Sequence, residues 1–170
     1  SRDSRIRVFV NSGRGKVAAF NSGLKSAIGD YIHLLAGDDE LAPACLRECL
    51  LRCQEAKADV VYHDNVFIDR RGRRTGTRAN GRELAELSLD ECALRMIVIG
   101  GGFYFFARRF VDLFWPQPEE WLAEDLSLAL AFKLEGTVAY LPVPLYHYRQ
   151  HPGQSLGAEY DYSASLYVKR

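Results

Sequence analysis

The stretch IGDYIHLLAGDDELAP, residues 28–43, decides the fold of this chain. Its centre, Tyr31–Ala36, is a short apolar run between turn residues, a pattern that predicts a buried strand. The strand is expected to stop at Gly37-Asp38-Asp39-Glu40, and Pro43 suits the first turn of a helix that follows. The stretch therefore predicts a strand that ends in an acidic loop and leads into a helix.

The same alternation extends in both directions. The residues before this stretch predict a strand over Ile6–Val10 and a helix over Lys16–Ile28, and those after it predict a helix to about Lys57 and a strand over Asp59–His63. Such alternation is typical of an α/β domain with parallel strands and right-handed crossovers. Ligands of such sheets bind outside the carboxyl ends of the strands. The polar residues expected at those ends are Asn11, Asp38, Asp39, His63 and Asp64.

The second half of the chain also mixes helices and strands. A capping box over Ser88–Glu91 predicts a helix start. The other elements predicted are strands over Phe103–Ala107, Val138–Leu141 and Leu145–Tyr148 and helices over Arg108–Phe114 and Glu124–Glu135. We therefore expect one domain over residues 1–155, followed by a tail over residues 156–170.

Charge and hydropathy exclude several classes of protein. The 22 Lys and Arg residues balance 22 Asp and Glu residues, whereas proteins that coat nucleic acid carry a basic excess. The longest nearly apolar run, Met96–Ala107, is shorter than the ~20 residues that a membrane-spanning helix needs. Positive charge gathers in Arg70–Arg82, which is typical of a solvated hairpin loop or, alternatively, of a contact to an anionic ligand or membrane surface.

Three of the four cysteines, Cys45, Cys49 and Cys53, are spaced by four residues and form one stripe on a helix. The favoured interpretation is a buried face of small apolar side chains. A single metal ion would not easily reach all three thiols, because they span two helical turns, and it would need a fourth ligand.

The most informative polar motif is Asp38-Asp39, directly after a buried strand. Adjacent carboxylates repel each other, so two at one strand end require a cation or hydrogen-bond donors. A divalent metal that also holds a diphosphate would supply the cation. The equal alternative is a cap on the helix that starts near Pro43.

Two later segments carry further candidates. The helix dipole favours Glu124 and Asp125 at a helix start, and a carboxylate there that faces a cleft can act as a general base on a hydroxyl. The run Tyr146–His151, with Ser155 after it, places anion or metal contacts beyond a strand; an exposed polar strand end is the alternative.

Together, these motifs resemble family-two inverting glycosyltransferases, which have the GT-A fold. The resemblance covers about Ile6 to Ser155. It rests on the ordered set Asn11-x-Gly13, Ala19-x-Asn21-x-Gly23-Leu24, Ala27-x-Gly29-Asp30-Tyr31-Ile32, Leu35, Asp38-Asp39, Pro43, Glu124-Asp125-Leu126, Gly136, Leu141, Tyr148-Arg149-x-His151 and Ser155. It implies a GT-A-like fold with a mixed, mostly parallel sheet flanked by helices.

The resemblance also implies roles for single residues. Asp38 matches the second acid of the family's Asp-x-Asp motif, which holds Mg²⁺ or Mn²⁺ on the donor diphosphate, and Asp125 matches the base that deprotonates the acceptor hydroxyl. His151 is implied as a metal or diphosphate contact. The other implied donor or diphosphate contacts are Asn11, Asn21, Asp39 and Arg149.

The chain departs from the family pattern in two ways. Ala36 stands where the motif has its first acid, so metal binding is expected to rest on Asp38 and His151. The family's usual strand, helix and strand ahead of Ile6 are not in this sequence, so we expect an N-terminally incomplete domain.

The expected function is transfer of a sugar from a nucleotide-diphospho-sugar to a hydroxyl of a saccharide or lipid-linked saccharide, in surface polysaccharide synthesis. The resemblance implies a cytoplasmic location, with Arg70–Arg82 as the contact to the inner face of the membrane. One alternative is a GT-A-like binding domain without catalysis. Another is a dinucleotide-binding domain, because Gly13-x-Gly15-x-x-Ala18 follows the first expected strand.

Overall fold

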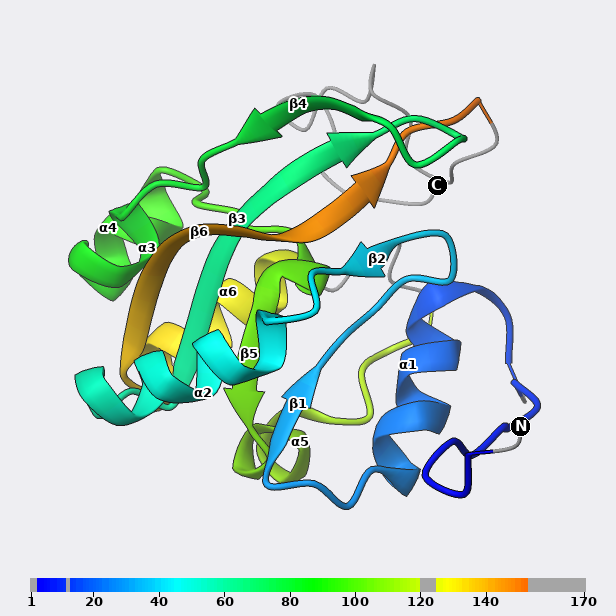
Figure 1. The fold of residues 1–170 in the computed structure, drawn as a ribbon. Helices are drawn as coiled ribbons and strands as arrows, with labels where there is room; N and C mark the ends of the chain where they lie inside the picture. Colours follow the sequence, from blue (N-terminus) through cyan, green and yellow to red (C-terminus); the bar gives the residue numbers. More distant parts are fainter. Residues whose placement is uncertain (1–2, 12, 120–124, 153–170) are drawn as a thin grey trace, which may run out of the picture.

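The computed structural model describes residues 3–11, 13–119 and 125–152 (Figure 1). The helices are α1 Gly15–Ser26, α2 Cys45–Ala56, α3 Glu83–Glu86, α4 Leu89–Leu94, η1 Gly101–Phe103 (a 3₁₀ turn), α5 Arg109–Phe114 and α6 Asp125–Glu135. The strands are β1 Tyr31–His33, β2 Glu40–Leu41, β3 Val60–Ile68, β4 Arg74–Arg78, β5 Tyr104–Ala107 and β6 Val138–Arg149. The expected tail over residues 156–170 lies outside the described residues, as does Ser155.

One sheet holds all six strands, in the order β1-β5-β3-β6-β2 with β4 paired to β3. Only β3 and β6 pair in parallel; every other pair is antiparallel. The prediction of a mostly parallel sheet is therefore wrong. One part of the prediction holds: β1 and β3, which are connected through α2, run in the same direction. Strand β5 comes from much later in the chain and lies between them, antiparallel to both.

Two helical layers bury the faces of this sheet (Figure 1). On one face, α2 presents Cys45, Cys49 and Cys53 to the core, together with Val61 and Phe105 from the strands. On the other face, α5 and α6 pack an aromatic core against the sheet, which includes Tyr104, Phe106, Phe110 and Phe132. The predicted stripe of buried thiols is thus confirmed, and all four cysteines are free.

The strand predicted over Ile6–Val10 does not form, and all four of its apolar side chains are more than half exposed: Ile6 at 58%, Val8 at 84%, Phe9 at 51% and Val10 at 93%. An apolar run becomes a strand only when another strand supplies its hydrogen bonds, and no described strand pairs with this segment. The glycines that open α1 therefore follow no strand in the described chain. That removes the structural setting a dinucleotide fingerprint needs.

Strand β3 is longer than predicted, which changes the position of two polar residues. His63 and Asp64 lie in the middle of the strand, at 0% and 7% exposure, and not at its end. The strand continues because β4 and β6 both pair with its second half. Asp64 is accommodated by two donors, the Tyr140 hydroxyl at 2.6 Å and the backbone N–H of Asn80 at 2.7 Å.

Several local predictions are confirmed. The Ser88–Glu91 capping box starts α4, and the first part of the basic run, Arg70–Arg73, forms the tip of the β3–β4 hairpin, where Asp69 pairs with Arg73.

The two strands expected over Val138–Leu141 and Leu145–Tyr148 form one irregular strand, β6, whose register to β3 shifts at His63 and Asp64. None of the helices in the described part of the chain combines the length and the apolar character needed to cross a bilayer.

Candidate active site

The acidic loop after β1 is attached to β6 through Asp39. One carboxylate oxygen of Asp39 accepts a hydrogen bond from the Tyr146 hydroxyl at 2.7 Å, and the other accepts one from the Arg149 backbone N–H at 2.7 Å. Burial raises the pKa of the Asp39 carboxyl above its usual range, although these two hydrogen bonds oppose the shift. Both oxygens of Asp39 thus hold the loop in place.

Asp38 points the other way and meets His151. Its Oδ2 lies 3.0 Å from Nε2 of His151, and the two side chains are 42% and 22% exposed. The sequence predicted these two residues as a shared metal site, and the structure brings them into contact. The capping alternative is wrong, because Ala44 is the N-cap of α2 and no side chain caps that helix.

The guanidinium of Arg149 forms hydrogen bonds with groups of the protein itself. Its guanidinium donates to the backbone carbonyls of Asp38 at 2.7 Å and Asp69 at 3.0 Å, and it pairs with the carboxylate of Glu40. The side chain therefore clamps the acidic loop to the β3–β4 turn. The predicted contact of Arg149 with a diphosphate stays a prediction. The positive charge of its guanidinium lies next to the backbone carbonyl of Asp38.

Asp125 is the first described residue of α6, at the predicted helix start, and the residue is 6% exposed. Its Oδ1 accepts a hydrogen bond of 2.8 Å from the backbone N–H of Gly101. The next residue, Gly102, lies against Tyr146, since a β-carbon there would come 2.7 Å from the Tyr146 hydroxyl. That hydroxyl binds Asp39, so the contacts run continuously from Asp125 to the acidic loop. Glu124, the rival candidate for the base, lies outside the described residues.

The two predicted asparagines lie apart from this set. Asn21 exchanges two hydrogen bonds with the backbone of Gln117, at 2.8 and 3.0 Å, and so ties α1 to the segment before α6. The exposed Asn11 bonds the backbones of Gly13 and Gly15 at the start of α1. Their contacts in the described chain do not connect them to Asp38 or His151.

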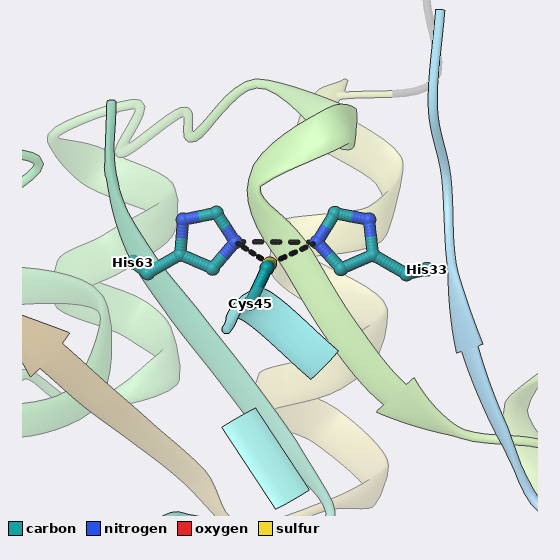
Figure 2. Close-up of side chains that lie close together, drawn as sticks. All are labelled: His33, Cys45 and His63. Carbon is teal, nitrogen blue, oxygen red and sulfur yellow. Dashed lines mark hydrogen bonds between the residues drawn. The ribbon is translucent and has the colours of Figure 1, made fainter. Parts of the chain in front are cut away.

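A second group of reactive side chains was missed by the sequence analysis. His33 from β1, Cys45 from α2 and His63 from β3 converge on one point under α2 (Figure 2). The pKa of the Cys45 thiol is lowered, first by a hydrogen bond from Cys49 and then by the two imidazoles. The available signal was His33 inside one expected buried strand and His63 at the end of another, where a polar side chain needs a partner.

The chain is similar in sequence to one protein family and to two curated proteins. The family described as "Glycosyl transferase family 2" matches residues 1–113. "O-antigen biosynthesis protein RfbC" of Myxococcus xanthus is 34% identical over 76 residues, which are 44% of this chain and 6% of that protein. "Uncharacterized glycosyltransferase EpsJ" of Bacillus subtilis (strain 168) is 35% identical over 60 residues, 35% of this chain and 17% of that protein.

Among solved structures, residues 1–349 of S. aureus TarS in complex with UDP-GlcNAc share the fold. The TM-score is 0.59 at 17% identity, over 85% of this chain and 41% of that one. The chain thus spans less than half the length of each of these proteins.

Proposed function

Since the chain belongs to glycosyl transferase family 2, we propose that it transfers a sugar from a nucleotide-diphospho-sugar to a hydroxyl of a saccharide or lipid-linked saccharide, with inversion at the sugar carbon. The observation that carries the proposal is the continuous set of contacts from Asp125 through Gly101, Gly102 and Tyr146 to the acidic loop. It joins a candidate base to a candidate diphosphate site.

Asp38 and His151 form the diphosphate end of the proposed site. A carboxylate oxygen and an imidazole nitrogen 3.0 Å apart, both partly exposed, could share a divalent cation, and the nitrogen ligand suits Mn²⁺ better than Mg²⁺, which prefers oxygen ligands. When bound, the cation would neutralise charge on the leaving diphosphate. Since Ala36 offers no second carboxylate, we expect weak metal binding without the donor and stronger binding with it.

Asp125 is the proposed base. It begins α6, where the helix dipole stabilises an ionised carboxylate, and the Gly101 N–H fixes its orientation. It would accept the proton of the acceptor hydroxyl as that oxygen attacks the sugar carbon and the nucleoside diphosphate leaves. This reaction needs no protein nucleophile.

The context of the reaction is also a proposal. The two relatives named above support surface polysaccharide synthesis, and the TarS complex makes UDP-GlcNAc the first donor to test. We propose that the reaction takes place on the cytoplasmic side of the membrane. The arginines of the β3–β4 hairpin are the proposed contact to anionic lipid.

Asp125→Asn tests the base, in the 170-residue chain and in the protein expressed from its complete gene. The variant keeps the shape and loses the basicity, so we expect UDP-GlcNAc binding by calorimetry to survive while transfer falls by about 10²–10⁴. Asp112→Asn, an exposed acid on α5, is the matched control and should leave both unchanged. Transfer at the wild-type rate in Asp125→Asn would remove this residue from the mechanism.

Asp38→Asn tests the metal. We expect loss of Mn²⁺-dependent donor binding with little change in stability, because Asp38 is partly exposed. The control is Asp30→Asn, an exposed acid just before β1. Donor binding that is equal in Asp38→Asn and wild type would show that the cation is held elsewhere.

A GT-A-like binding domain without catalysis remains the second candidate, because Ala36 replaces an acid and the donors of Arg149 are engaged within the chain. It predicts that a panel of nucleotide-sugars with Mn²⁺ gives binding but no transfer to any hydroxyl acceptor. Measured transfer would exclude it.

A further inference from the structure

The three side chains under α2 have the arrangement of a metal site. Nε2 of His33 lies 3.2 Å from Nε2 of His63, and Sγ of Cys45 lies 3.6 and 3.7 Å from these two nitrogens (Figure 2). We propose that His33, Cys45 and His63 bind a zinc ion that braces the fold, at a site separate from Asp38 and His151.

The outer hydrogen bonds of the two rings show that Nδ1 is the donor in each, which makes Nε2 the ligand atom of a neutral ring. Nδ1 of His33 lies 3.0 Å from the Leu34 carbonyl, and Nδ1 of His63 lies 2.9 Å from the Asp64 carbonyl. A carbonyl only accepts, so each Nδ1 carries the proton and each neutral ring presents a lone pair at Nε2. Two lone pairs and a sulfur that face one another repel unless a cation or an added proton lies between them.

The spacing of the three atoms fits zinc. With Zn–N of about 2.0–2.1 Å and Zn–S of about 2.3 Å in a tetrahedron, the N–N edge is about 3.3 Å and each N–S edge about 3.6 Å. The observed edges, 3.2, 3.6 and 3.7 Å, form one face of such a tetrahedron. The outer carbonyl partners are also what metal-bound histidines usually have.

The ligand types and their surroundings favour zinc over copper. Two imidazoles and a thiolate suit both metals, but electron-transfer copper sites usually add a distant Met. Met96, the chain's single methionine, is 51% exposed and follows α4. The three ligands are His33, partly buried, and Cys45 and His63, both at 0% exposure, so the site is largely closed to solvent.

Asn65 gives a second, independent sign of a polar occupant. It is 1% exposed, and neither atom of its amide has a hydrogen-bond partner among the described residues. It follows His63 by two residues on β3, so both side chains stand on the same face, about 6.6 Å apart along the strand. A water in the fourth position of the zinc would give this amide a partner.

The site would connect elements that are otherwise distant in the chain. β1 and β3 are separated by β5, and the two imidazoles meet over it beneath the first turn of α2. The Tyr146 ring stacks against His33 with centroids 6.3 Å apart, and its hydroxyl binds Asp39. By holding His33 in place, zinc would therefore stabilise Tyr146 and the acidic loop without contacting the nucleotide-sugar.

The test is metal analysis of the 170-residue chain, purified without chelator. We expect about one zinc per chain by mass spectrometry. The zinc affinity is measured by adding zinc to the metal-free protein in competition with a chromophoric chelator. We expect this affinity to fall by more than about 100-fold in Cys45→Ala and in His63→Ala, because loss of a group that only hydrogen-bonds a metal ligand already costs up to about 100-fold. Cys53→Ala, a buried thiol on the same face of α2, is the matched control and should bind zinc like wild type.

Cobalt substitution decides the question even if a variant fails to fold. Wild-type protein with Co²⁺ should show intense tetrahedral d–d absorption and a thiolate-to-cobalt charge-transfer band. Absence of that band in wild type would overturn the proposal in favour of a proton shared among the three side chains. Its persistence in Cys45→Ala would overturn it too, because another thiol would then hold the metal. Zinc that stays in Cys45→Ala and is lost in Asp38→Asn would place the metal at the donor site instead. None of these outcomes depends on sugar transfer.

Discussion

Tyr146 is the residue on which the two candidate sites meet. Its hydroxyl donates to Asp39 and accepts from the backbone N–H of Ala36 at 3.2 Å. Its ring stacks on His33 and packs edge-on against Phe103. A change in the position of this one side chain would therefore reach the acidic loop and the histidine pair together.

Gly102→Ala tests that dependence. A β-carbon at position 102 would come 2.8 Å from two ring carbons of Tyr146, closer than real contacts allow, so we expect a loss of about 1–3 kcal/mol in the free energy of unfolding. Weaker Mn²⁺-dependent donor binding should accompany it. Gly76→Ala is the control, because its β-carbon would meet Phe67 at an ordinary 3.6 Å. Equal stability of both variants in urea titrations would show that Tyr146 moves freely.

The buried pair Tyr140 and Asp64 has a defined pH dependence. Burial first, and then the hydrogen bond to Asp64, raise the pKa of Tyr140 from 10.0 to about 12. The folded state thus favours the protonated phenol, and the stability that this pair contributes is present below pH 10.0 and is lost as the pH rises towards about 12.

We expect Tyr140→Phe to lower the free energy of unfolding by about 1.5–3 kcal/mol at neutral pH, the usual value for a hydrogen bond to a charged group. The difference from wild type should shrink above pH 10.0. Urea titrations at several pH values measure it, and the same substitution in an Asp64→Asn background is the control, where the cost should be smaller. A difference that does not change with pH would contradict this account.

At the scale of elements, helices followed from the sequence more reliably than strand partners did. The apolar spacing of α1 and α2, the capping box of α4 and the acidic start of α6 are local signals, and all four helices form. The partner of a strand is a non-local property. Nothing in Tyr31–His33 specifies that Phe105 and Phe106 of β5 will pair with it, and nothing in Ile6–Val10 shows whether a partner exists.

The apolar face of α2 predicts how its thiols react. Cys45, Cys49 and Cys53 are at most 2% exposed, so a thiol reagent should modify them only after denaturation. The comparison is informative because their pKa values differ: burial raises that of Cys53 to about 11, whereas that of Cys45 is lowered. Mass spectrometry of labelled peptides gives the result. Rapid labelling of Cys45 alone in native protein would show that its ionisation outweighs its burial.

At the scale of the whole molecule, the order of motifs predicted the family and the contact of Asp38 with His151. These two predictions succeeded because each motif is a short run of neighbouring residues that can be recognised without knowing the fold. The convergence of His33, Cys45 and His63 could not be predicted, since it depends on β5 entering between β1 and β3 and on α2 lying over that gap. The inward engagement of Asp39 and Arg149 likewise appears only once β6 is in place.

The parallel pairing of β3 with β6 has a consequence for synthesis of the chain. Val60 pairs with Val138, so one edge of the central strand has no partner until the last described part of the chain has left the ribosome. Pairing between such distant residues is slow, and an open strand edge invites association with other chains. Newly made molecules should therefore depend on chaperones until Val138–Arg149 emerges, and a chain that stops at Thr137 should accumulate as aggregate.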